Sequence, residues 1–149
     1  MRRTLATLGL ALCTLALAAS PAQAESFKDF GEYRVHYNAF TSDMLTPEVA
    51  RNYDIQRSGY RAVLNIAVQE KTPEGYVPVA ADVGASATNL NAQLRRLDVR
   101  EIREDQAVYY IADFEVANEE VLDFDIRVRP KGEERTFGIR FRQQFFGPQ

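Results

Sequence analysis

Hydrophobic and polar residues alternate with a period of two along most of the chain from Glu32 onward. This period places successive side chains on opposite faces of an extended segment, so it predicts half-buried β-strands rather than helices. The clearest segment is Leu122–Arg129, in which four apolar residues share one face and four charged residues share the other. Thr136–Arg142 repeats the alternation. Both segments are therefore predicted as strands with one face in a hydrophobic core.

These two strands are predicted to form a hairpin around Gly132-Glu133. Glycine adopts the positive φ that the first position of a type II′ turn requires, so we expect a two-residue turn there. In this register, residues of opposite charge face one another, and apolar residues do the same. The expected pairs are Asp123 with Arg142, Asp125 with Arg140, Phe124 with Phe141, and Ile126 with Ile139. A shift by one residue would set carboxylates against aromatic rings, so the sequence favours this register.

Further alternating segments raise the number of expected strands to about seven. They are Tyr33–Asn38, Tyr60–Gln69, Val77–Ala85, and the two strands Leu97–Arg103 and Ala107–Val116 of a second hairpin. Pro78 lacks the N–H group that a strand ladder needs, so its strand is expected at a sheet edge. The short, evenly spaced strands are typical of an all-β fold, and we predict an immunoglobulin-like β-sandwich.

Two segments depart from the alternation. Thr46–Tyr53 begins with a capping Thr and has Pro at the first helical position, which predicts one short helix between strands. Asn89–Leu97 is compatible with two structures. Its leucines have helical spacing after a capping Asn, but a loop that leads into the next strand would show the same pattern.

The first 24 residues have a different pattern. Arg2 and Arg3 precede an apolar run, Leu5–Ala19, and Ala22-Gln23-Ala24 has the small residues of a cleavage site. These features predict a secretory signal peptide that is cleaved before Glu25. The apolar run has 15 residues, fewer than the roughly 20 that a membrane-spanning helix needs. We therefore expect one domain, residues 25–149, exported to the periplasm or beyond it, without a membrane span.

Cleavage would change the chemistry and the charge of the chain. The only cysteine, Cys13, lies in the predicted signal peptide, so no disulfide could form in the 125 residues that remain of 149. Leu12 is bulky, which argues against a lipoprotein site at Cys13. The remaining 16 basic and 21 acidic residues give a net charge of −5, with both signs interspersed. This distribution argues against binding of nucleic acid or anionic membranes.

Candidate catalytic residues are few. A hydrolase triad would need the only histidine, His36, together with Ser42, Ser58 or Ser86. The chain contains no Gly-x-Ser-x-Gly motif. Because His36 lies on the polar side of a predicted strand, we interpret it as a surface histidine.

Metal-ligating residues give no stronger indication. One histidine and no cysteine after cleavage exclude the usual zinc sites, and no cofactor is expected. Asp123 and Asp125, with Asn118–Glu120 nearby, are the only candidate calcium ligands. The hairpin register already pairs both aspartates with arginines. Glycoside hydrolysis would need two carboxylates at a set separation, which the fold determines.

Aromatic residues provide the best candidate for a recognition surface. Tyr109-Tyr110 places adjacent rings on opposite faces of a strand, so we expect one in the core and one at the surface. The predicted binding patch consists of His36, Tyr37, Tyr53 and Arg57.

Several segments together resemble a known family. They are His36–Phe40, Leu45–Ala50, Tyr53–Ser58, Asn89-Leu90, Val108–Ala112 and Asn118–Leu122. Their order is that of DUF4426, a family of small exported proteins from gamma-proteobacteria that is classified only as a domain of unknown function. The resemblance implies a periplasmic protein with one sandwich-like domain, and it carries over no catalytic or ligand residue.

These features predict a non-catalytic binding or accessory module of the cell envelope, with an unknown protein or glycan as its partner. One alternative is a protein that binds carbohydrate or another small envelope ligand. A second is an assembly factor that pairs with its partner through an exposed strand edge. The last is a hydrolase that uses His36.

Overall fold

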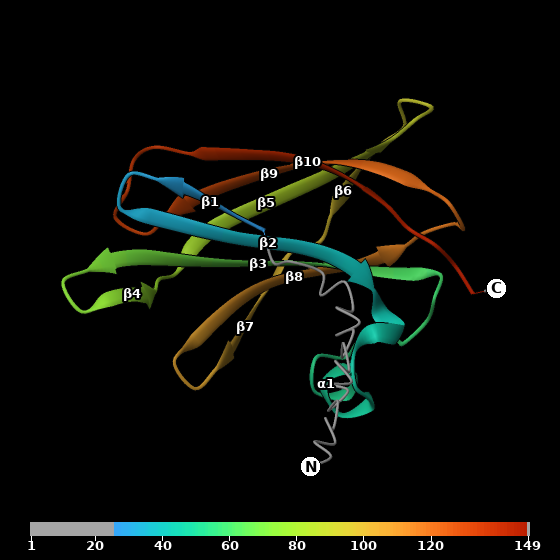
Figure 1. Cartoon of the computed structure of the whole chain (residues 1–149), viewed down its shortest axis with the longest axis horizontal. Coiled ribbons are helices and arrows are strands. Elements are labelled where there is room, and N and C mark those ends of the chain that lie inside the picture. Colours follow the sequence, from blue (N-terminus) through green and yellow to red (C-terminus); the bar gives the residue numbers. More distant parts are fainter. Residues whose placement is uncertain (1–25, 149) are drawn as a thin grey trace, which may run out of the picture.

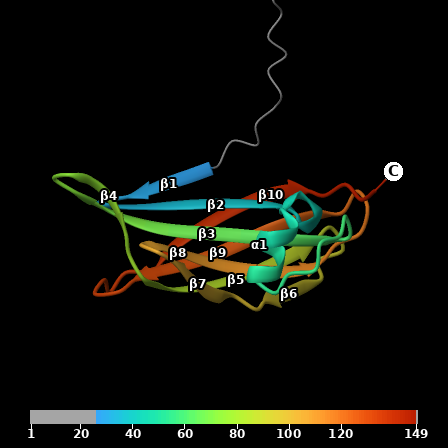
Figure 2. The same cartoon turned by 90° about the horizontal axis from the view of Figure 1, so that it is seen from below.

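The computed structural model describes residues 26–148, which form two antiparallel sheets packed face to face (Figures 1 and 2). Sheet A has the order β1 (Ser26–Phe30), β2 (Tyr33–Thr41), β3 (Arg61–Thr72), β8 (Ala107–Glu115) and β7 (Arg100–Glu104), and β4 (Gly75–Pro78) also pairs with β3. Sheet B has the order β10 (Phe137–Gln144), β9 (Val121–Pro130), β5 (Ala81–Asn89) and β6 (Leu94–Leu97). The predicted all-β sandwich is confirmed. The expected signal peptide, its Cys13 and the new N-terminus at Glu25 lie outside the described residues.

The described residues contain ten strands instead of about seven, partly because two expected strands are each divided between the sheets. Val77–Ala85 breaks after Pro78, so that β4 ends in sheet A and β5 begins in sheet B. Leu97–Arg103 is divided in the same way between β6 and β7. The alternation continues across each break because the inner faces of both sheets point into one core. As predicted, Pro78 lies at an edge, since β4 pairs with β3 alone.

The hairpin of β9 and β10 has the predicted register. Phe124 pairs with Phe141 and Ile126 with Ile139, and the charged pairs lie between them on the other face. The prediction of a two-residue turn was wrong, because residues 131–136 connect the strands. The Glu133 N–H donates to the Pro130 carbonyl over 3.0 Å, and Gly132 has a φ of 84°. Gly132 therefore occupies the third position of a type II turn rather than the first position of a type II′ turn.

The two segments outside the alternation form different structures. Thr46 caps the predicted helix, α1 (Pro47–Asn52), where its hydroxyl accepts the Val49 N–H over 3.3 Å. Asn89–Leu97 forms no helix but, as in the second expected structure, a connection that leads into the next strand: the turn between β5 and β6, followed by β6 itself. The Asn89 side chain accepts two backbone N–H groups there, as it would at a helix start, which explains the ambiguous pattern. No helix among residues 26–148 has the length and apolarity needed to cross a membrane.

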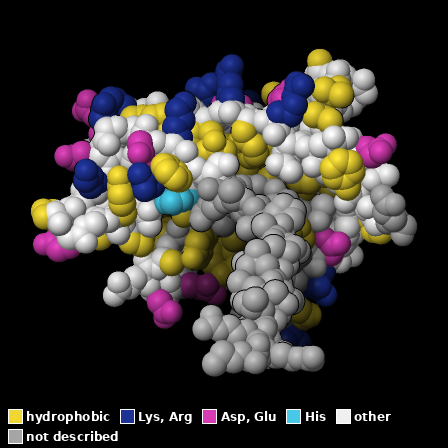
Figure 3. All heavy atoms as spheres, viewed as in Figure 1, with side chains coloured by type: hydrophobic (Ala, Val, Ile, Leu, Met, Phe, Trp, Pro, Cys, Tyr) yellow, Lys and Arg dark blue, Asp and Glu magenta, His cyan; other side chains and the backbone are white. Residues whose placement is uncertain are grey.

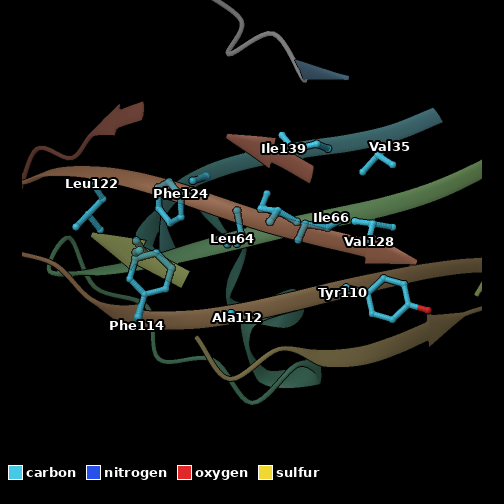
Figure 4. Close-up of a cluster of buried hydrophobic side chains, with 14 of the residues drawn as sticks. Val35, Leu64, Ile66, Tyr110, Ala112, Phe114, Leu122, Phe124, Val128 and Ile139 are labelled. Atoms are coloured by element: carbon cyan, nitrogen blue, oxygen red, sulfur yellow. The ribbon is translucent and has the colours of Figure 1, made fainter. Parts of the chain in front are cut away.

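The hydrophobic core fills the space between the two sheets (Figure 4). Leu64 and Ile66 of sheet A meet Phe124 of sheet B, and all three side chains are almost completely buried. The ring of Phe124 stacks on that of Phe141 with 4.8 Å between the centroids. Tyr110 is buried as well, and its hydroxyl accepts the backbone N–H of Ala81 over 2.8 Å. This bond links sheet A to the first residue of β5 in sheet B.

Candidate functional site

The outer face of sheet A carries a second apolar cluster, separate from the core. Ile55, Val63 and Ile111 are buried in it, and the partly buried Phe40, Leu45, Tyr53, Ile102 and Tyr109 pack around them. Val63 and Ile111 alternate with core residues on their strands, so they point away from the sandwich. The covering segment, residues 42–58, shields this face from water, and Figure 2 shows its helix α1 in front of the strands. It also contains η1 (Ser42–Met44).

Hydrogen bonds inside the covering segment join its two ends. The Ser42 side chain is fully buried, where its hydroxyl donates to the Gln56 carbonyl over 2.6 Å and accepts the Ser58 N–H over 2.9 Å. The Arg57 guanidinium donates to the carbonyls of Asp43 and Leu45. These bonds connect residues 12 to 16 positions apart in the sequence. The two ends of the covering segment are therefore held together by hydrogen bonds between its own residues.

Further contacts attach the covering segment to sheet A. Arg100 of β7 donates to the backbone carbonyl of Tyr53. The Arg100 guanidinium also lies 3.9 Å from the Asp113 carboxylate, which forms an ion pair with Arg61. Through Arg100, the end of α1 is held against the strand that forms the edge of the sheet.

A pocket of about 210 Å³ lies between the covering segment and sheet A. We call it the sheet A pocket, and its lining consists of Phe40, Leu45, Tyr53, Ile55, Val63, Asn65, Glu104, Tyr109 and Ile111. Seven of these nine residues are aliphatic or aromatic. The volume is below the ~300–1,000 Å³ that is common for pockets of drug-sized ligands, so it suits a group of about the size of one ring.

Asn65, one of the lining residues, has an amide oxygen without a hydrogen-bond partner. Its Oδ1 atom is buried and has no hydrogen-bond partner. Asn38 faces Asn65 across β2 and β3, and the Oδ1 of Asn38 is also buried and unpaired. A buried polar group without a partner costs about 1–3 kcal/mol, and native proteins contain few of them. The described residues thus leave two enclosed amide oxygens beside each other without a partner.

Glu104 is the second polar residue of the sheet A pocket and interacts with Tyr53. The pKa of Tyr53 is raised to about 12, mainly by burial of the phenol. The hydrogen bond to Glu104 and the charge of that carboxylate raise it further. The phenol therefore remains protonated at neutral pH and donates to the carboxylate. Since an ionised carboxylate offers about four lone-pair sites, Glu104 can accept further hydrogen bonds.

The four residues of the predicted binding patch do not share one surface. Tyr53 lines the sheet A pocket, and Arg57 is engaged inside the covering segment. Tyr37 lies on the inner face of β2, where its ring packs against Phe141. The preceding residue, His36, faces outward, and its Nε2 lies 2.8 Å from Oε1 of Gln69 on β3. Alternation along β2 therefore separates the two neighbouring aromatic residues.

The sequence interpretation missed most of the residues that line the sheet A pocket. One indication was available: Val63 and Ile111 are apolar at positions that the alternation assigns to the polar face. Asn65 and Glu104 gave no such indication, because single polar residues on strands are common. Of the Tyr109-Tyr110 pair, Tyr110 lies in the core and Tyr109 on the outer face, in agreement with the prediction.

The candidate triad residues lie in different parts of the fold. Ser42 is six positions beyond His36 along an extended segment, a distance of ~20 Å at ~3.3 Å per residue. Ser58 is hydrogen bonded to Ser42, and Ser86 belongs to β5 in the other sheet. Within residues 26–148, no group of three or more His, Cys, Asp or Glu side chains is placed to hold a metal ion.

The outer face of sheet B is organised by cross-strand ion pairs. Arg142 donates two hydrogen bonds to Asp123, at 2.7 and 2.9 Å, and Arg140 donates one to Asp125 at 3.1 Å. Figure 3 shows basic side chains along the upper edge of the molecule, where Figure 1 places β10. A hollow of about 550 Å³ lies on this face, and these four residues supply all of its charged groups. The predicted cross-strand partners thus satisfy one another.

The comparisons with known proteins agree with the sequence resemblance. Residues 27–147 match DUF4426, a domain of unknown function. The crystal structure of a DUF4426 family protein from Pseudomonas aeruginosa PAO1 is 34% identical, with a TM-score of 0.74, and the match covers 86% of this chain and 99% of that one. No curated protein matches the chain.

More distant structures share the fold. FetP from uropathogenic Escherichia coli strain F11 matches as a copper-bound variant and as isolated after recombinant expression in the E. coli periplasm, with TM-scores of 0.57 and 0.56. These matches cover 84% and 85% of this chain and 97% and 96% of the FetP chains, at 8% identity, which shows likeness of fold alone. The match over residues 27–147, together with the 34% identical crystal structure, shows that the chain belongs to the DUF4426 family.

Proposed function

We propose that the protein is an exported, non-catalytic binding module of the cell envelope and that the sheet A pocket is its ligand site. The observation that carries this proposal is a pocket with mostly apolar walls and two polar residues, Asn65 and Glu104. A ligand that buries an apolar group there and donates a hydrogen bond to the Glu104 carboxylate would match both kinds of lining.

The construction of the covering segment supports this proposal. Its internal hydrogen bonds and its attachment through Arg100 are present without any ligand. A preformed pocket binds more tightly than one that must first be ordered, because less conformational entropy is lost on binding. These bonds support a pocket that is formed before a small molecule binds.

Export is supported by the pattern of residues 1–24, which predicts a cleaved signal peptide. FetP, which shares the fold, was isolated after recombinant expression in the periplasm, so a protein of this fold can be obtained from that compartment. Mass spectrometry of the protein from a periplasmic fraction tests the proposal, and we expect a chain that starts at Glu25. Leu10→Arg, which interrupts the apolar run, should leave the precursor uncut in the cytoplasm. An intact precursor in the membrane fraction of wild-type cells would contradict export with cleavage.

The ligand site can be tested with indole as a ring-sized probe in an NMR titration. We expect indole in the millimolar range to shift the methyl resonances of Ile55 and Ile111, which line the sheet A pocket. Val63→Phe should abolish these shifts by filling the pocket. The matched control is Ala67→Phe, four residues along the same outer face of β3 but outside the lining. Equal shifts in both variants would exclude the sheet A pocket as the site.

A further inference from the structure

The sheet A pocket has the composition of a site for organic cations. We propose that it selects an amine: an ammonium group on an apolar body, with the charge between the aromatic residues and Glu104. This inference rests on the proposed function, because it takes the sheet A pocket as the binding site.

The aromatic lining supplies the first argument. Phe40, Tyr53 and Tyr109 contribute three aromatic rings to one small pocket. The face of an aromatic ring carries partial negative charge and attracts an ammonium group, most strongly where water is excluded. The aliphatic side chains of the covering segment and the sheet floor would contact the apolar body of the same ligand.

The charge of the lining supplies the second argument. Glu104 is the only charged residue among the nine described residues that line the sheet A pocket. The nearby Arg100 guanidinium is engaged by the Tyr53 carbonyl and lies close to the Asp113 carboxylate. An anionic ligand would therefore meet a carboxylate without an opposing cation, whereas an ammonium group would gain an ion pair with Glu104, which is exposed and therefore reachable.

The balance of donors and acceptors supplies the third argument. The Glu104 carboxylate accepts the hydrogen bond of the Tyr53 hydroxyl and has further lone pairs to offer. An ammonium group carries only donors, up to three, so it can bond to this carboxylate without bringing an acceptor that needs a partner.

Three probes of similar size and different charge test the inference. They are phenethylamine, which is cationic at neutral pH, phenethyl alcohol, which is neutral, and phenylacetate, which is anionic. Titration of the purified protein, followed by the Ile55 and Ile111 methyl resonances, gives each dissociation constant. We expect the amine to bind about tenfold more tightly than the alcohol, and phenylacetate to bind below detection.

Variants on β7 identify the group that recognises the charge. Glu104→Gln removes the charge but keeps an acceptor for the Tyr53 hydroxyl, so it should weaken amine binding about tenfold and leave alcohol binding almost unchanged. Glu101→Gln is the matched control, because Glu101 lies on the same strand but alternates to the opposite face and pairs with Arg103. It should bind all three probes like the wild type.

The outcomes separate the two proposals. Equal binding of amine and alcohol at the Ile55 and Ile111 methyl groups would overturn selectivity for amines and leave the sheet A pocket as a binding site. Amine binding that Glu104→Gln does not change would overturn the role of that carboxylate and with it the inference. If none of the probes shifts these resonances, both the inference and the proposed ligand site are wrong.

Discussion

The outer faces of the two sheets treat their polar groups in different ways. On sheet B, Asp123 and Asp125 each receive hydrogen bonds from an arginine on the neighbouring strand. On sheet A, the covering segment hides an apolar surface, and the buried amide oxygen of Asn65, a residue that lines the sheet A pocket, has no partner. The hollow on sheet B is the larger one, about 550 Å³ against 210 Å³. Unused bonding capacity, rather than volume or charge, therefore distinguishes the candidate site.

The two arrangements also differ in what they cost. The ion pairs on sheet B are largely exposed, so they add little stability and keep a charged surface neutralised. The unpaired oxygens on sheet A are buried, and their burial lowers the free energy of unfolding.

The largest expected effect concerns the core on which both faces depend. Phe124→Ala should lower the free energy of unfolding by about 3–5 kcal/mol, because it removes a ring that stacks on Phe141 and leaves a cavity. Urea denaturation measures the loss. Phe146→Ala is the control, since that side chain is 59% exposed and should change stability by no more than about 0.5 kcal/mol. An equally small decrease in the free energy of unfolding for Phe124→Ala and Phe146→Ala would contradict a core around Phe124 that both sheets share.

An intermediate effect should have opposite signs on the two faces. Asn65→Leu replaces an unpaired buried amide with an apolar side chain of similar size, so it should raise the free energy of unfolding by about 1 kcal/mol. Asp125→Leu leaves Arg140 without its partner and should lower it by at most about 1 kcal/mol. The same urea experiments decide both. A loss of stability in Asn65→Leu would contradict the claim that Asn65 lacks a partner.

The smallest expected effects are responses to pH, again of opposite sense on the two faces. The hydrogen bond from Arg142 lowers the pKa of Asp123, so its contribution to stability is complete above the ordinary value of 3.8 and is lost as the pH falls through the lower folded value. The pKa of Tyr53 is raised to about 12 from 10.0, so its contribution is lost as the pH rises from 10 towards 12. Denaturation curves across pH check both directions. Asp123→Asn should flatten only the acid side, and Tyr53→Phe only the alkaline side.

Local patterns made the outer face of sheet B predictable. Alternation along β9 and β10 assigns the inward and outward residues, and opposite charges on the outward positions select one register, which the structure has. The helix α1 was predictable for the same reason, because its Thr cap and first-position Pro act over a single turn. The hairpin turn was less predictable, because Gly132 suits more than one turn type and only its neighbours decide which one forms.

The outer face of sheet A depended on contacts between distant segments. The sheet A pocket is lined by residues that lie far apart in the chain, among them Phe40, Tyr53, Val63 and Tyr109. They meet only because the covering segment folds back over the sheet. The sequence pattern also did not predict that two of the expected strands would each be divided between the two sheets. An alternating pattern records which residues point into the core, but it does not record the sheet to which each half belongs.

The sequence by itself determined an all-β sandwich, the inward face of most strands and the paired residues of β9 and β10. Each of these follows from side-chain periodicity and from interactions between adjacent strands of one hairpin. Only the tertiary structure decided which outer face is covered, that Tyr53 and Glu104 share a pocket, and that the Asn65 oxygen is buried without a partner. Burial and hydrogen-bond satisfaction are properties of the assembled surroundings, so no local pattern in the chain encodes them.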